Sequence, residues 1–284
     1  MTEPQIRPLQ PEDVAPLVEV QQKAFADLAR RLSEPAYELT DEFRERGQAR
    51  IGHLQRTDPD SAWVAEVDGA LAGASLALVR EGMWFLSLLF VHPDHMAKGV
   101  GRALLDAALT TATDRSWIMS TEDPAAVRRY RRAGFALHPT YTAKGTAHRP
   151  ALPAVRGLRE FEPDDRETLD QVLRKVRGAA MGPEVDYWQD RGVRIVVSPG
   201  KGFSVLRPQG TAWLAATDEE TARDLLVTTL AEAPGEVEVD WLGADQQWAI
   251  DVCLDARLTL TSAASLCLRG QPAMSPYLPC GAFG

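Results

Sequence analysis

Residues 91–105, with the sequence VHPDHMAKGVGRALL, constrain the fold more than any other stretch of the chain. The apolar run at residues 84–91 predicts a buried strand, which Pro93 ends because proline cannot donate a hydrogen bond to a sheet. Gly99 and Gly101 lie where a helical pattern begins. Glycine lets the backbone approach a ligand closely, and the free N–H groups of a first helical turn favour an anion. The stretch therefore predicts a strand, a loop suited to phosphate, and a helix.

Two common phosphate-binding loops do not fit this stretch. A P-loop is excluded because no Gly-Lys-Ser/Thr follows four residues after a first glycine. The Gly-x-Gly also lacks the third glycine of the dinucleotide fingerprint, since Leu104 stands there and no regular βαβ unit follows. The residues alone leave two interpretations open: a phosphate-cradling turn of unassigned family, or a helix start that merely needs a tight turn.

The surroundings of the loop resemble the GCN5-related N-acetyltransferases (GNATs). The first GNAT motif, Arg/Gln-x-x-Gly-x-Gly/Ala after a strand that ends in Val-x-Pro, corresponds here to residues 96–101 after residues 91–93. The next motif is Asn-x-x-Ala-x-x-x-Tyr-x-x-x-Gly-Phe. Its positions are Asp123, Ala126, Tyr130, Gly134 and Phe135. The two motifs occur in the family's order and separation, and the resemblance covers residues 1 to about 150.

The resemblance implies that acetyl-CoA is a co-substrate and that no metal is involved. The loop N–H groups would hold the diphosphate, Lys98 and Arg102 would add positive charge, and the exposed strand edge would pair with the pantetheine. The expected cofactor-binding residues are Leu89, Phe90, Val91, Met96, Ala97, Lys98, Gly99, Val100, Gly101, Arg102 and Asp123. Met96 stands where the family usually has Arg or Gln, and Asp123 where it has Asn. Loss of a polar side chain at Met96 predicts weaker binding.

Tyr130 is the expected general acid, because the matching tyrosine of the family lies near the CoA sulfur and a phenol can protonate the leaving thiolate. Without the motif, Tyr130 would be interpreted as a core residue of an amphipathic helix. The basic residues of the same helix are interpreted as a solvated face, with a contact of one of them to the 3′-phosphate of CoA as the alternative: Arg128, Arg129, Arg131 and Arg132. The predicted central strand contains no Glu, Asp or His, so the base must lie elsewhere. Glu122 is the first candidate because it follows the predicted strand at 117–120. Asp123, Glu66 and a water chain remain alternatives.

The predicted element order of residues 1–148 is strand, two helices, three antiparallel strands, helix, strand, helix and final strands. Thr40 is predicted to start the second helix, and Asp68-Gly69 predicts the tight turn of a hairpin. This is the α/β order that the resemblance implies: a central, mostly antiparallel sheet flanked by helices. Residues 149–156 contain two closely spaced prolines and predict a linker. The chain after them begins again, because residues 158–165 echo residues 6–13. We therefore predict two tandem GNAT-like domains, with chance similarity as the alternative.

The second predicted domain, residues 157–284, is expected to be a degenerate copy. Residues 216–223 stand where the loop should be, but they lack Gly-x-Gly and contain three acids. Thr217 is predicted to be an ordinary helix N-cap, with Glu220 completing a capping box. Tyr130 has no clear counterpart there, and no Gly-Phe follows.

Composition limits the classes of function. A net charge of −9 argues against nucleic acid as the main partner, and most of that charge lies after residue 150, where it would repel a polyanionic cofactor. No apolar run approaches the roughly 20 residues of a membrane helix, and the N-terminus lacks the pattern of a signal peptide. Three cysteines without metal-ligand spacing favour reduced thiols. These features predict a cytoplasmic protein without membrane or metal.

The leading hypothesis is an N-acetyltransferase that moves an acetyl group from acetyl-CoA to a primary amine. Direct attack in a ternary complex is expected, because no Cys or Ser lies where a covalent intermediate would form. The alternative is a non-catalytic acyl-CoA-binding or protein-interaction module on the same fold. The acceptor, a small molecule or a peptide, is open, with Tyr37, Trp63 and Trp84 as candidate pocket walls. The second copy could replace a homodimer partner, which favours a monomer and leaves a homodimer possible.

Overall fold

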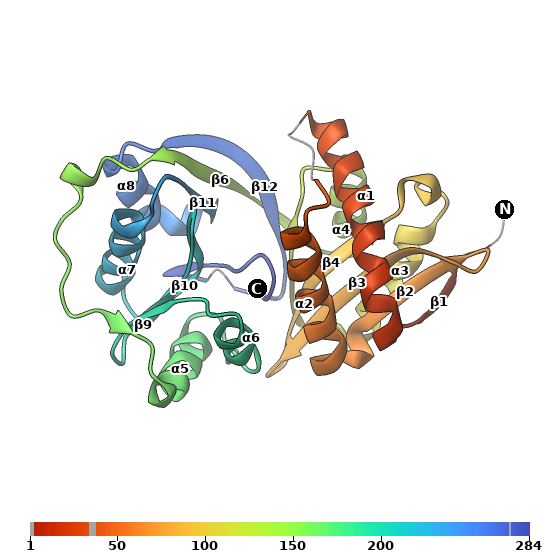
Figure 1. The fold of residues 1–284 in the computed structure, drawn as a ribbon, viewed down its shortest axis with the longest axis horizontal. Helices are drawn as coiled ribbons and strands as arrows, with labels where there is room; N and C mark the ends of the chain where they lie inside the picture. The colour runs from red at the N-terminus through yellow and green to blue at the C-terminus, as the bar shows by residue number, and fades with distance from the viewer. Residues whose placement is uncertain (1–2, 34–37, 273) are drawn as a thin grey trace. The chain divides into compact units, whose positions relative to one another are not determined.

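The chain forms two compact units, residues 1–135 (unit 1) and residues 136–284 (unit 2) (Figure 1). The structure is a computed structural model, and it describes residues 3–33, 38–272 and 274–284. Tyr37, named above as a candidate pocket wall, lies outside the described residues. No helix among the described residues is both long enough and apolar enough to cross a membrane.

Unit 1 is a mixed α/β domain built around one sheet. Its elements are β1 (Gln5–Pro8), α1 (Val14–Leu32), α2 (Asp41–Thr57), β2 (Ala62–Val67), β3 (Ala70–Arg80), β4 (Met83–Val91), α3 (Val100–Ala108), β5 (Arg115–Ser120) and α4 (Pro124–Arg132). The strand order is β1-β2-β3-β4-β5, and only the β4–β5 pair is parallel. The predicted order of elements through α4 is confirmed.

Alternation along the strands places α1 and α3 on opposite faces of this sheet. Phe90 of β4 packs edge-to-face on Phe25 of α1, with ring centroids 6.4 Å apart. Ser75 of β3 faces the other way, and its hydroxyl donates to the carbonyl of Leu104 in α3 at 2.9 Å. Successive strand residues point to opposite faces, so each helix covers one face. Figure 1 shows α1 and α2 in front of the strands.

The two hairpins of unit 1 follow from their turn residues. Asp68 and Gly69 both have positive φ, at 52° and 77°, and they join β2 to β3. Glu81 and Gly82 join β3 to β4 with φ of 46° and 76°. Two positive φ angles in succession are typical of type I′ turns, whose twist matches that of a hairpin. The predicted Asp-Gly hairpin is confirmed.

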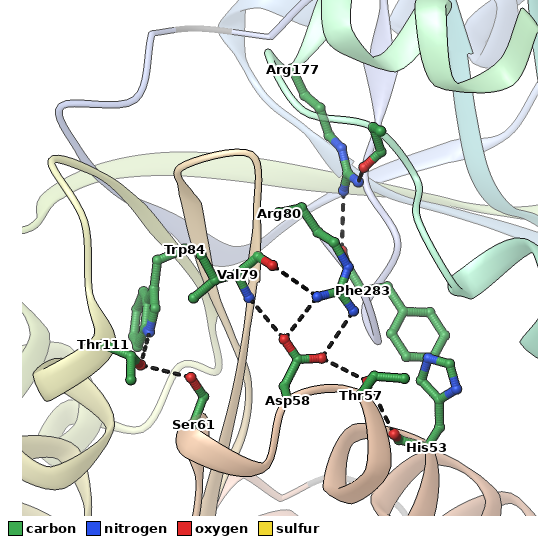
Figure 2. A network of polar contacts seen from close by, with 11 residues as sticks. His53, Thr57, Asp58, Ser61, Val79, Arg80, Trp84, Thr111, Arg177 and Phe283 are labelled. Carbon is green, nitrogen blue, oxygen red and sulfur yellow. Dashed lines mark hydrogen bonds and ion pairs between the residues drawn. The ribbon is translucent and has the colours of Figure 1, made fainter. Parts of the chain in front are cut away.

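A buried ion pair fastens α2 to the end of β3 (Figure 2). The Asp58 carboxylate, just after α2, accepts hydrogen bonds from Arg80 Nη1 at 2.7 Å and from Arg80 Nη2 at 2.9 Å. It also accepts from the backbone N–H of Val79 at 3.1 Å and from the Thr57 hydroxyl at 2.7 Å. A buried charge with this many partners is well compensated, so the network holds the C-terminus of α2 against the end of β3.

Unit 2 contains two groups of antiparallel strands. Its elements are β6 (Ala136–Thr146), β7 (Arg159–Glu160), α5 (Arg166–Val176), α6 (Glu184–Asp190), β8 (Ile195–Ser198), β9 (Gly202–Arg207), β10 (Gly210–Ala216), α7 (Glu219–Glu232), β11 (Glu236–Leu242), α8 (Gln247–Asp255), β12 (Thr259–Arg269) and β13 (Tyr277–Leu278). One group of strands forms a sheet of the order β7-β8-β9-β10-β13, and the strands β12, β6 and β11 pair with one another in that order. Arg177 is buried in this unit, where it donates to the carbonyl oxygen of Ala179. It also donates to the carbonyl oxygen of Phe283 (Figure 2).

The two compact units divide after Phe135, whereas the domain boundary at residue 148 stays a prediction. The strand β6, expected to be the last strand of the first domain, lies between β12 and β11. Ala143 of β6, for example, is paired with Leu260 on one side and Val239 on the other. Such pairing joins residues about a hundred positions apart, and no local pattern in the sequence reports it.

The two halves of the chain repeat one order of elements. In both it is strand, 3₁₀ turn, two helices, three strands, helix, strand, helix, strand, from β1 to β6 and again from β7 to β12. The sequence echo at the two starts corresponds to one turn. Arg7 Nη1 donates to Asp13 at 2.6 Å, and Arg159 Nη1 donates to Asp165 at 2.6 Å. This repetition fits a tandem arrangement of two GNAT-like copies.

These two turns make stability sensitive to acid. Hydrogen bonds from Arg7 and Arg159 lower the pKa of Asp13 and of Asp165 below the ordinary value of 3.8. A carboxylate with a depressed folded-state pKa stabilises the fold above its unfolded pKa and loses this contribution as pH falls through the folded pKa. We therefore expect the free energy of unfolding to decrease as the pH is lowered below about 4. Urea unfolding curves between pH 7 and pH 3 measure this.

In the same experiment Asp165→Asn should lower stability at pH 7 and weaken the dependence on pH. Asp190→Asn, which removes one exposed charge at the end of α6, is the control. An Asp165→Asn variant with the pH dependence of the wild type would contradict the role assigned to this ion pair.

Candidate functional site

The strands β4 and β5 pair only over the first part of β4. Parallel pairing runs from Met83 and Arg115 to Leu86 and Ile118. Within the described chain β4 continues to Val91 with pairing to β3 alone. Beyond Leu86, one edge of β4 therefore presents backbone groups that β5 does not take. An unpaired edge can pair with an extended ligand, and the predicted residues Leu89, Phe90 and Val91 lie on it.

A β-bulge marks the point where β4 leaves β5. Leu88 pairs with Leu76, but the next pair along is Leu86 with Ala77, so the register between β3 and β4 shifts at Ser87. Arg50 of α2 holds this bulge. Its Nη2 donates to the Ser87 carbonyl at 2.6 Å, and its Nε donates to the Ser87 hydroxyl at 3.1 Å. Bulges are common beside active sites because they redirect a strand. Sequence reasoning missed Arg50 and Ser87, because only the register reveals a bulge.

The loop from β4 to α3 leaves its backbone N–H groups available. Gly99 is the N-cap of α3 with φ of 88°, a conformation that favours glycine, and it supplies no side chain to cap the helix. No backbone carbonyl among the described residues accepts a hydrogen bond from the N–H groups of residues 97–101. These groups can therefore donate to an anion, which the helix macrodipole also favours.

The basic side chains of the loop each contact another group of the protein. Lys98 is exposed and donates to the carbonyl of Asp94 at 2.7 Å. Arg102 is also exposed and lies 3.5 Å from Asp106 on the same helix. Met96 is partly buried. The anion-binding character of the loop therefore rests mainly on its backbone.

Gly101 lies where three elements meet. It is buried in the first turn of α3, and a Cβ there would be 3.2 Å from Val91 Cγ2 at the end of β4. The same Cβ would be 3.1 Å from Nη1 of Arg129 in α4. Three features therefore meet at Gly101: the end of the unpaired edge of β4, the N-terminus of α3, and the helix α4. A side chain at position 101 would enter this point, so the structure accounts for the second glycine of the motif.

The predicted catalytic residues lie on or just before α4. Tyr130 is 6% exposed and belongs to α4. Glu122 is exposed in the turn between β5 and α4. Asp123 is the N-cap of α4, where its carboxylate accepts from the Ala125 N–H at 3.0 Å and lies 3.3 Å from Arg31. Asp123 thus has a structural role, and Glu122 is the acid near this helix without such a role.

Other predicted residues belong to the framework. Glu66 accepts a hydrogen bond from Arg7 Nε at 2.9 Å, which joins β2 to β1. Trp84 is fully buried, and its Nε1 donates to Thr111 at 3.3 Å, so it cannot line a pocket (Figure 2). Trp63 packs on the apolar cluster under α3. Among the described residues, no group of three or more His, Cys, Asp or Glu could hold a metal ion.

The corresponding helix start in unit 2 is closed by a carboxylate. The N-cap of α7 is Asp218, whose side chain accepts from the Thr221 N–H at 2.8 Å. This hydrogen bond lowers the pKa of Asp218. The predicted N-cap, Thr217, was wrong by one residue, because aspartate caps a helix as well as threonine does. Glu219 and Glu220 follow in the first turn, so this site repels anions.

Two further features distinguish unit 2 from unit 1. The edge of β10 at Leu214 and Ala215 pairs with β13, whereas the corresponding edge of β4 is open. Cys253 of α8 takes the place of Tyr130, since the backbone contact of Phe135 with Tyr130 in α4 recurs between Leu258 and Cys253 in α8. Burial raises the pKa of Cys253 to about 12.

Comparison with known proteins finds one family model that matches part of unit 1 and several solved structures with the same fold. Residues 23–135 match the family described as acetyltransferase (GNAT). No curated protein matches the sequence. The whole chain superposes on a proposed acetyltransferase from Pyrococcus horikoshii with a TM-score of 0.77, 15% identity and coverage of 100% of this chain and 97% of the other.

Two further solved structures share the fold over most of the chain. A GCN5-related N-acetyltransferase from Kribbella flavida has a TM-score of 0.62 at 15% identity, with 94% of this chain and 71% of the other covered. One from Sphaerobacter thermophilus has a TM-score of 0.58 at 15% identity, with 95% and 97% covered. At this level of identity the structures establish the fold.

Proposed function

Because residues 23–135 match the acetyltransferase (GNAT) family, we propose that the chain transfers an acetyl group from acetyl-CoA to a primary amine. One observation carries the proposal: the unpaired edge of β4 leads into the uncapped N-terminus of α3, and both meet at Gly101. An acyl-CoA has the matching parts in the matching order. Its pantetheine is an extended chain with amide groups, and its diphosphate is an anion.

In this proposal the backbone does most of the binding. The N–H groups of residues 97–101 hold the diphosphate, and the edge at Leu89, Phe90 and Val91 pairs with the pantetheine amides. An N–H of this edge receives the thioester oxygen and stabilises the negative charge that develops on it. Because these contacts come from the main chain, they tolerate Met96 in place of the usual polar residue.

The proposed reaction is a direct attack of the amine on the thioester within the ternary complex. The neutral amine forms a bond to the thioester carbon, the carbon–sulfur bond breaks, and the thiolate of CoA takes a proton from Tyr130. The amine loses its extra proton to Glu122 or to water that leads to solvent. A phenol is a suitable acid because a positioned donor lowers the barrier to expulsion of the thiolate.

The test is thiol release from acetyl-CoA with a panel of amines: aminoglycosides, polyamines, amino acids and peptides with a free N-terminus. The proposed function requires amine-dependent thiol release for at least one class. A protein that binds acetyl-CoA and releases thiol with none would instead fit a non-catalytic acyl-CoA-binding protein. That alternative is favoured by one observation: Glu66 and Asp123 are held in ion pairs, which leaves Glu122 as the remaining candidate among the acidic side chains considered.

Binding should occur at one site per chain. Unit 2 has a carboxylate at the start of α7, a partner strand on the edge of β10, and Cys253 in place of the tyrosine. The first two features oppose a bound acyl-CoA, and the third removes the proposed proton donor. Calorimetric titration should therefore give a stoichiometry of one acetyl-CoA per chain. A stoichiometry of two would contradict the closure of unit 2.

A further inference from the structure

The Arg129 side chain brings a positive charge to the N-terminus of α3. Its Nη1 and Cζ atoms lie 3.1 and 3.4 Å from the position that a Cβ of Gly101 would occupy. The start of a helix already carries a partial positive charge from its free N–H groups. Over the part of the chain that the structure describes, no carboxylate forms an ion pair with Arg129. Two positive groups thus converge without an internal counter-charge.

Three other basic side chains of the loop, α3 and α4 contact acceptor groups of the protein itself. Lys98 donates to the Asp94 carbonyl, Arg102 pairs with Asp106, and Arg131 donates to the carbonyl of Phe135 at 3.3 Å. Arg129 is partly buried against α3, whereas Arg128, one position earlier, is exposed. Position 129 is therefore the place on α4 from which a guanidinium reaches the loop. The loop itself offers Met96 where the family pattern has a polar side chain.

We propose that Arg129 binds the diphosphate of acetyl-CoA together with the N–H groups of the α3 first turn, and so supplies from α4 the contact that Met96 cannot make. This inference rests on the proposed function. A guanidinium presents a planar fork of N–H donors that matches two phosphate oxygens, and such charge-assisted hydrogen bonds are about twice as strong as neutral ones. An anion between Arg129 and Gly101 would also satisfy both converging positive groups.

The experiment compares Arg129→Gln with the matched variant Arg128→Gln. Calorimetry measures the affinity of each for CoA and for dephospho-CoA, which keeps the diphosphate but lacks the 3′-phosphate. Arg129→Gln should weaken binding of both ligands by the same factor, about 10- to 100-fold. Arg128→Gln should bind both within about twofold of the wild type. Arg129→Lys keeps the charge without the fork, so it should show a smaller loss and serves if Arg129→Gln does not fold.

Three outcomes would overturn the inference. Arg129→Gln with wild-type affinity for both ligands would remove Arg129 from the site. A loss confined to CoA would assign Arg129 to the 3′-phosphate instead of the diphosphate. An equal loss in Arg128→Gln would show a general effect of charge on α4. Wild-type protein that binds neither ligand would contradict the proposed function itself, so the two failures are distinguishable.

Discussion

Replacing Gly101 by glutamate is expected to abolish binding of acetyl-CoA. The new Cβ would lie within 3.2 Å of both Arg129 Nη1 and Val91 Cγ2, and the carboxylate beyond it would occupy the N-terminus of α3. It would accept the hydrogen bonds that the diphosphate needs and would repel the phosphates. A like-charge contact of this kind costs several kcal/mol, so the dissociation constant should rise by about 100-fold or more. Calorimetric titration with acetyl-CoA measures it.

The control for Gly101→Glu is Gly235→Glu. Gly235 precedes β11, and a Cβ there would meet nothing within 4 Å, so the variant adds the same charge in open space. It should bind acetyl-CoA as the wild type does. If Gly101→Glu also kept wild-type affinity while it remained folded, the site would not lie at the start of α3.

The second large effect is expected for Tyr130→Phe, which removes one hydroxyl from a residue that is 6% exposed. If Tyr130 protonates the leaving thiolate, kcat should fall by about 100-fold or more, because a positioned general acid contributes a factor of this size. The Michaelis constant for acetyl-CoA should change little, since the backbone contacts remain. Steady-state kinetics with the best amine of the panel separate the two parameters.

Packing is the competing role for Tyr130, and the same variant tests it. Phenylalanine preserves the ring, so the melting temperature should stay close to that of the wild type. A variant with unchanged kcat would show that Tyr130 is a core residue of α4. A variant that loses both stability and activity would also indicate that Tyr130 acts through packing.

The sequence predicted the elements that carry the site because those signals are local. Asp68-Gly69 fixed one hairpin through its turn type, and Thr40 was correctly placed before α2, where it accepts from the Phe43 N–H. Gly99 and Gly101 indicated the start of α3, because each position favours a residue without a side chain. Gly99 has a positive φ, and a Cβ at position 101 would crowd Val91 and Arg129. The echo between the two starts was detectable because each copy needs the same arginine and aspartate, Arg159 and Asp165 in the second.

The sequence did not predict features that depend on pairing between distant residues. The placement of β6 between β11 and β12 is set by register, as is the bulge at Ser87 that Arg50 holds. Trp84 was named as a candidate pocket wall although it is fully buried, because a strand with apolar residues on both faces gives no alternation from which to assign a face. Arg129 was treated as one of several solvated arginines, because the four basic residues on α4 look alike without the position of α3.

Hydrogen exchange with and without acetyl-CoA tests the central claim most directly, because it locates the site as well as detecting binding. The account predicts that acetyl-CoA slows exchange of backbone amides in residues 89–102, from the open edge of β4 to the first turn of α3. It also predicts slower exchange in α4, and no change at residues 214–222 of unit 2. Protection at residues 214–222, or no protection at residues 89–102, would contradict it.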